Sequence, residues 1–296
     1  MLFRSVFTLY RREIRRGFLD MLRSKEFYFS FLVTAALLFV PLLLSLFTFF
    51  RKDLVYIEPA YYYWGAAGMG YSWGGDDLPN TYLNALINEV FCSMCLPFVA
   101  SLSYAYRMFD DRKSGAMQVI VPRVGYRTYC FGVVTVTFLG GFLTVFLPFV
   151  LEQLVLLVAC PFDVPFMISN LPFEDTYLDY YGNAAGGALS ALLLNHPYVY
   201  NFLFCLLPAV LAGLFGTLSA VLSLYLVKSR FLTLTLVGIL WIVLSFVTGA
   251  LYFKWNVGMA AVSNGNFTLY PIVAGALLLA DALLLFGAFR RKDVGL

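Results

Sequence analysis

The chain has 296 residues, of which 61% are hydrophobic and only 12% are charged. Soluble domains usually contain about 45–50% apolar and about 25% charged residues, so this composition excludes an ordinary soluble protein and indicates an integral membrane protein. The net charge is +3, and the distribution of the charges along the chain is more informative than their sum.

Residues 1–26 are expected to form an amphipathic helix. Apolar side chains recur at spacings of three and four, and seven of the remaining positions are Lys or Arg. This pattern is typical of a helix that lies in the membrane interface with its basic groups near anionic lipid headgroups. A cytosolic helix packed on another subunit is the alternative interpretation, and both can hold together.

Six later segments are apolar and long enough to cross the hydrocarbon core of a membrane, which takes about 20 residues. Two long segments interrupt them, residues 51–81 and residues 160–198. We therefore predict an all-α integral membrane protein, with an interfacial helix over residues 1–26 and a single six-span transmembrane domain over residues 27–296. The predicted spans are residues 27–50, 83–106, 129–158, 198–227, 231–253 and 269–289.

The positive charges predict the orientation of the chain. Seventeen of the twenty Lys and Arg residues lie on the side of the membrane that carries both termini. Because basic residues concentrate on the cytosolic side, both termini and residues 107–127 are expected to be cytosolic. Residues 51–81 and 160–198 are then external loops. The compact layout favours the plasma membrane of a bacterium.

Two carboxylates fall within predicted spans. Asp281 lies well inside the sixth span, and Glu89 lies in the second. Carboxylates at membrane depth are costly, so each is a possible intramembrane functional site. For Asp281 the alternative is a structural hydrogen bond to a Ser, Thr or Tyr of a neighbouring helix. Glu152, counted along the helix from Arg127, lies about 37 Å away, beyond a core of about 30 Å, and is expected at the membrane interface.

Small residues in the fourth predicted span indicate close helix packing. Gly213, Gly216 and Ala220 recur at helical spacing, which places them on one side of the helix. Small side chains at such positions allow another helix to approach closely.

The chain carries no phosphate-binding G-x-x-x-x-G-K-[ST] motif and no H-E-x-x-H zinc motif. With one histidine and scattered carboxylates, it is not expected to be an enzyme or to hold a metal or cofactor by itself. If it takes part in active transport, ATP and Mg must be bound by a separate subunit. No nucleic-acid partner is expected.

Residues 107–127 form the longest charged interruption between two predicted spans. Five of these residues are basic, whereas the middle, residues 117–121, is mostly apolar. A solvated loop does not need an apolar middle. A short helix that lies against a partner or against the membrane does, so we expect such a helix here.

The layout and this segment resemble the membrane subunit of type-2 ATP-binding-cassette exporters. Residues 109–115 read Phe-x-Asp-Arg-x-x-Gly, and a Pro-Arg pair follows at residues 122–123. In that family the corresponding loop forms a coupling helix that docks on the ATP-hydrolysing subunit. The resemblance implies an ATPase-coupling role for Phe109, Asp111, Arg112, Gly115, Pro122 and Arg123.

The expected function is therefore that of a permease subunit of an ATP-driven transporter. It would export or extrude an amphipathic cargo, such as a peptide, a lipid or a drug. Its expected partners are an ATP-binding-cassette ATPase, the lipid membrane, and a second copy of itself or a homologous permease. The alternative is a non-transporting sensor, immunity or scaffold subunit that binds a peptide or protein partner through its external loops.

Overall fold

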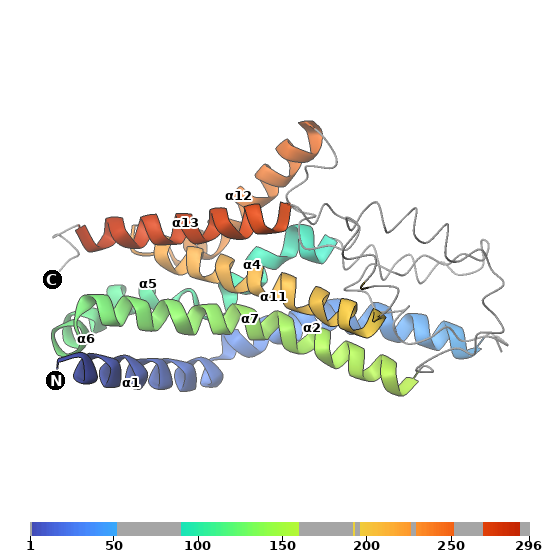
Figure 1. Ribbon diagram of the computed structural model, residues 1–296, viewed down its shortest axis with the longest axis horizontal. Coiled ribbons are helices and arrows are strands. Elements are labelled where there is room, and N and C mark those ends of the chain that lie inside the picture. The colour runs from blue at the N-terminus through green and yellow to red at the C-terminus, as the bar shows by residue number, and fades with distance from the viewer. Residues whose placement is uncertain are drawn as a thin grey trace.

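The structure is a computed structural model, and it describes residues 2–51, 90–159, 192, 196–225, 229–251 and 269–290 (Figure 1). Within these ranges the chain is helical and contains no strand. The helices are α1 Leu2–Arg23, α2 Lys25–Arg51, the π-helical η2 Phe91–Cys95, α4 Leu96–Tyr104, α5 Arg107–Lys113, α6 Ala116–Val124, α7 Tyr126–Ala159, α11 Pro197–Leu222, α12 Arg230–Leu251 and α13 Leu269–Arg290.

Five of the described helices are long and apolar enough to cross a membrane. They are α2, α7, α11, α12 and α13, and they coincide with five of the six predicted spans. The second predicted span is described only from residue 90 onward, where the apolar helical stretch Phe91–Tyr104 is shorter than a full crossing. The all-helical fold with several membrane-length helices is confirmed, whereas the sixth crossing stays a prediction.

The centre of the bundle is the packing of α7 against α11 (Figure 1). A Cβ atom added to Gly141 of α7 would lie 2.7 Å from the backbone oxygen of Ala212, so the two backbones nearly touch there. The predicted stripe of small residues on α11 takes part in this packing. Gly213 faces the ring of Phe138, Gly216 approaches α4 and α7, and Ala220 is fully buried.

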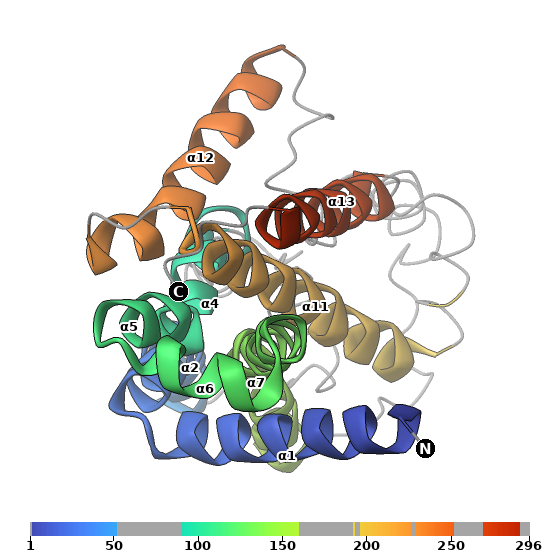
Figure 2. The ribbon, with the colours of Figure 1, turned by 90° about the vertical axis from the view of Figure 1, so that its left-hand side faces the viewer.

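Helix α12 is attached to the bundle through α4, α11 and η2. Gly238 leaves room for the ring of Phe98, because an added Cβ would lie 2.4 Å from it. The indole nitrogen of Trp241 donates a hydrogen bond of 2.9 Å to the backbone oxygen of Ser93, inside the π-helical turn. Figure 2 shows that α12 then leans away from the other helices, while α13 lies over α11.

Helix α1 packs along α7 of the same chain (Figures 1 and 2). Its apolar stripe includes Phe18 and Met21, which contact Val136 and Tyr104. Gly17 allows this approach, since an added Cβ would lie 3.0 Å from Val136. Most of the basic side chains of α1 are exposed on its other face. The expected amphipathic helix is confirmed, and the apolar side chains of its second half pack against this chain's own helices.

The elements of the basic segment gather at one end of the molecule. In Figure 1, α1, α5, α6, the start of α7 and the C-terminal end of α13 all lie at the left. The predicted external loops, residues 51–81 and 160–198, fall almost entirely outside the described residues, and Glu89 does so as well.

Candidate functional site

The segment between α4 and α7 folds into two short helices, which we call the α5–α6 unit. Gly115 separates them with φ 74°, and Gly125 separates α6 from α7 with φ 88°. Both values lie in the left-handed region that favours glycine, so two glycines set the shape of the unit. The expected short helix around residues 117–121 is confirmed as α6, and α5 is an additional helix that the sequence pattern did not indicate.

The apolar middle of the segment faces the chain's own bundle. Met117 and Val121 are buried in a cluster that also contains Tyr129, Val221 and Leu285. The expectation that the whole apolar middle serves a partner or the membrane is therefore wrong for these two side chains. The opposite side of α6 remains open.

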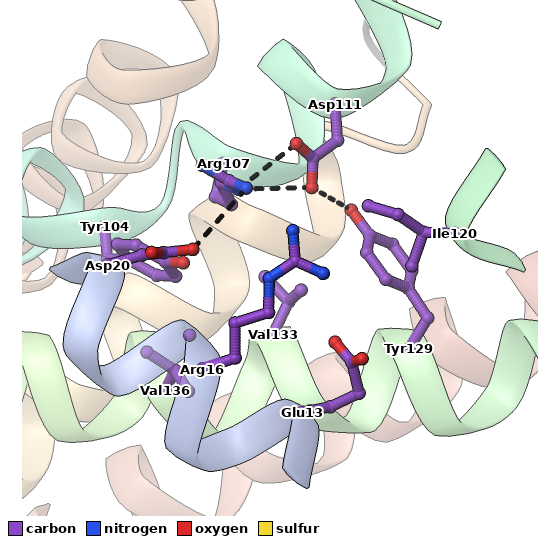
Figure 3. A pocket seen from close by; sticks show the side chains of 12 residues that line it. Glu13, Arg16, Asp20, Tyr104, Arg107, Asp111, Ile120, Tyr129, Val133 and Val136 are labelled. Atoms are coloured by element: carbon purple, nitrogen blue, oxygen red, sulfur yellow. Dashed lines mark hydrogen bonds and ion pairs between the residues drawn. The ribbon is translucent and has the colours of Figure 1, made fainter. Parts of the chain in front are cut away.

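Asp111 is buried at the junction between α5 and α7, with 5% of its surface exposed. The hydroxyl of Tyr129 donates to its Oδ2 at 2.7 Å, and Nε of Arg107 lies 3.1 Å from Oδ1 (Figure 3). A buried carboxylate with two partners of this kind is well stabilised. Asp111 therefore holds α5 against α7 and does not present its charge to the outside.

Arg107 extends this network to α1. Its Nη2 lies 3.8 Å from Oδ2 of Asp20, so one guanidinium joins carboxylates from two helices (Figure 3). Burial lowers the pKa of Arg107, but the negative charges around it, Asp111 first among them, outweigh burial, and the net shift is upward. Arg107 thus stays charged and binds α1 to α5.

The space among these side chains is too small for a substrate. It has a volume of about 20 Å³, which is room for roughly one water molecule. Figure 3 shows Arg16 and Glu13 of α1 beside the Asp111 network. This region is therefore a packed polar junction between helices and not a binding pocket.

Arg112 connects α5 to the end of α11. Its Nη1 donates a hydrogen bond of 2.6 Å to the backbone oxygen of Leu224, just beyond the last residue of α11. The carbonyl groups at a helix end lack partners within the helix, so an arginine there satisfies one of them and also suits the helix dipole.

Arg230, the first residue of α12, connects α12 to α2 and α5. Its Nη2 lies 2.8 Å from Glu26, and its Nη1 lies 3.7 Å from Asp110. The guanidinium also stands 4.1 Å from the ring centre of Tyr106. The hydroxyl of Tyr106 donates a hydrogen bond of 3.2 Å to Glu26.

Helix α5 is thus bonded through polar side chains to α1, α7, the end of α11 and the start of α12. Tyr106, the residue directly before α5, bonds to Glu26 of α2. The outer side of the α5–α6 unit carries exposed residues of mixed character, including Val119 with 57% of its surface exposed. The six residues to which the resemblance assigns a coupling role differ in their exposure. Phe109 and Asp111 are buried, Arg112 is half-buried, Gly115 forms the turn, and Pro122 and Arg123 are exposed.

Asp281 is buried between α13 and α11, with 7% of its surface exposed. Its Oδ2 accepts a hydrogen bond from the hydroxyl of Thr217, which is the kind of bond that the structural alternative expects. Thr217 also donates to the backbone oxygen of Leu214 at 2.7 Å.

Two features were not recognised in the sequence. Glu152 was expected at the interface but is 2% exposed, because counting along one helix ignores the neighbours that cover it, here Cys205 of α11.

Residues 70–74 read Gly-Tyr-Ser-Trp-Gly, which has the spacing of a serine nucleophile turn, but they lie outside the described residues.

The comparisons with known proteins add no candidate role. No family model, curated protein or solved structure matches this chain. Among the residues that the structure describes, no three His, Cys, Asp or Glu side chains come together to hold a metal ion. The functional argument therefore depends on the junction around α5 and on the exposed side of α6.

Proposed function

We propose that this chain is the membrane subunit of an ATP-driven exporter and that a separate ATPase docks on the outer side of the α5–α6 unit. The observation that carries the proposal is the set of polar contacts from α5 to four other elements. Two of these contacts are between charged groups, a third is the buried bond between Asp111 and Tyr129, and the fourth runs from Arg112 to the backbone oxygen of Leu224.

These contacts favour transmission of movement. A docked subunit that displaced α5 would also displace α1 through Arg107, α7 through Asp111 and α12 through Arg230, because the partner groups are 2.7–3.8 Å apart. Packed elements tend to move as rigid bodies between discrete arrangements. An element joined to most of the bundle is well placed to convert events outside the membrane into rearrangement inside it.

The location of the unit is compatible with docking from the cytosol. The positive-inside rule places it on the cytosolic side, together with both termini of a multi-pass plasma-membrane protein. Val119 supplies an apolar contact and Arg123 a charged one, a combination found in helices that fit a groove on a partner. ATP and Mg would be bound by that partner.

The cargo in this proposal is amphipathic, and the complete transporter contains a second copy of this chain or a homologous permease. A non-transporting sensor, immunity or scaffold subunit would share the docking surface but move no cargo. Reconstitution of the purified complex in vesicles separates the two, because only the exporter moves a fluorescent amphipathic peptide or lipid when ATP is added.

The test uses the full chain, purified from its native membrane with its partners. The double variant Val119→Glu/Arg123→Glu should lose the co-purifying Mg-dependent ATPase activity, because it changes only the exposed docking surface. The matched control Arg15→Glu reverses an exposed charge on α1 and should retain that activity. The proposal would be overturned if the wild type, the double variant and the control all co-purify with the same ATPase activity.

A further inference from the structure

A groove beside α13 has the dimensions of one lipid chain. It lies between α7, α11 and α13, has a volume of about 550 Å³, and is lined mainly by apolar side chains. Its wall on α13 runs from Leu278 to Phe289, which corresponds to about 16 Å of helix. The hydrocarbon core of a bilayer is about 30 Å thick, so the groove is as long as one leaflet is deep.

The groove opens on the surface that would contact lipid. Phe131 on one wall and Phe286 on the other have 47% and 53% of their surfaces exposed. Helix α13 makes its main contact with α11 and meets α7 where the ring of Phe289 packs against Tyr126 and Phe131. Beyond that contact, the space between α13 and α7 is left for another occupant.

Two arginines stand at one end of the groove. Arg290 lies 4.3 Å from the ring centre of Phe286, and Arg127 lies 5.8 Å from that of Phe289. Both rings line the groove, and both arginines are exposed. Neither arginine forms an ion pair with any residue that the structure describes. Two uncompensated positive charges beside an apolar groove attract an anionic headgroup.

The carboxylate of Asp281 lines the groove but is buried, so it does not offer a site for a cationic occupant. Asp281 is the one carboxylate that lines it, and it is more than nine-tenths buried and bonded to Thr217. A cationic amphiphile would need this carboxylate exposed, and its charge would be repelled at the end that carries Arg127 and Arg290. The charge pattern therefore favours an anion whose apolar tail extends toward Asp281.

We propose that this groove binds one anionic phospholipid. Its phosphate lies between Arg127 and Arg290, and one acyl chain lies along Phe131 and Phe138 toward Leu278. The lipid comes from the leaflet on the side of the α5–α6 unit, and its chain fills the space between α7 and α13. It therefore joins α13 to the helix that carries Tyr129, the partner of Asp111.

Native mass spectrometry of the purified full chain tests this, with phosphatidylglycerol and phosphatidylcholine added in separate titrations. One phosphatidylglycerol should bind more tightly than phosphatidylcholine. Arg127→Gln/Arg290→Gln should weaken its binding roughly 25-fold, since each basic residue near an anionic headgroup contributes about a factor of five. The control Arg15→Gln/Arg23→Gln removes two exposed charges of α1 and should leave this binding unchanged.

Two further variants separate the possible occupants. Ala282→Trp fills the groove without a change of charge and should also remove the tightly bound lipid, whereas Asp281→Asn should retain it. The proposal is overturned if both lipids bind equally, or if the double arginine variant binds like the wild type. It is also overturned if Asp281→Asn loses lipid binding while the double arginine variant retains it. A dimer that Ala282→Trp converts to a monomer would likewise overturn it, because the groove would then be filled by a second copy of the chain.

Discussion

The contact between Asp111 and Tyr129 gives the sharpest stability prediction. Asp111→Ala removes the acceptor of a buried hydrogen bond of 2.7 Å and the partner of Arg107. A hydrogen bond to a charged group contributes about 1.5–3 kcal/mol, and the Tyr129 hydroxyl would be left buried without this acceptor. The Arg107 side chain is 31% exposed, so water compensates for part of its loss, and the ion pair adds about 1 kcal/mol or less. We expect a total destabilisation of about 2–4 kcal/mol.

The free energy of unfolding in mixed micelles measures this, with Arg123→Ala as the control at an exposed site of α6. Tyr129→Phe should be destabilising by itself, and the double variant should show a coupling of about 1–2 kcal/mol with Asp111→Ala, since the two groups form one bond. Additive effects of the two substitutions, or a loss no larger than that of the control, would refute the assignment of Asp111 as the residue that fixes α5 on α7.

Four other substitutions test the helix packing and the turn at Gly115. Gly213→Ala should destabilise the protein by about 1–3 kcal/mol, because the added Cβ would lie 2.6 Å from the ring of Phe138. The Cβ atom added by Gly275→Ala meets nothing within 4 Å, so this variant should be neutral or slightly stabilising in the same measurement of unfolding in mixed micelles. Gly115→Val should cost about 1–2 kcal/mol because φ is 74° there, and circular dichroism melting would show it. Trp241→Phe should lower the melting temperature and change the near-ultraviolet signal, because the bond to the π-helical turn is lost.

Much of the architecture was predictable because the length and apolar composition of a segment identify it as a candidate membrane span. The amphipathic helix over residues 1–26, the short helix near Val119 and the small-residue stripe around Gly213 were all expected, and the structure contains them. The bond of Asp281 to a hydroxyl on another helix was one of the two alternatives stated for this residue, and the structure contains that bond. Each of these depends on a pattern within a single segment.

The arrangement of the α5–α6 unit was less predictable. A carboxylate in a short charged helix normally faces water, yet Asp111 is buried because Tyr129, eighteen residues later, supplies a hydroxyl. Arg230 reaches Glu26 across 204 residues of sequence, and no local pattern indicates that pairing. The rotation of each helix about its own axis, relative to its neighbours, decides which of its residues face inward. Local sequence patterns do not determine that rotation for the short helices α5 and α6.

The central claim is that an ATPase docks on the outer side of α6. The most direct measurement places a photoactivatable amino acid at Val119 in the full chain in cells, with a second one at Phe246, an exposed position of α12. We predict that position 119 crosslinks to a protein that carries the phosphate-binding motif absent from this chain, and that position 246 does not. Crosslinks from position 119 to lipid alone, or equal crosslinking from both positions, would contradict the account.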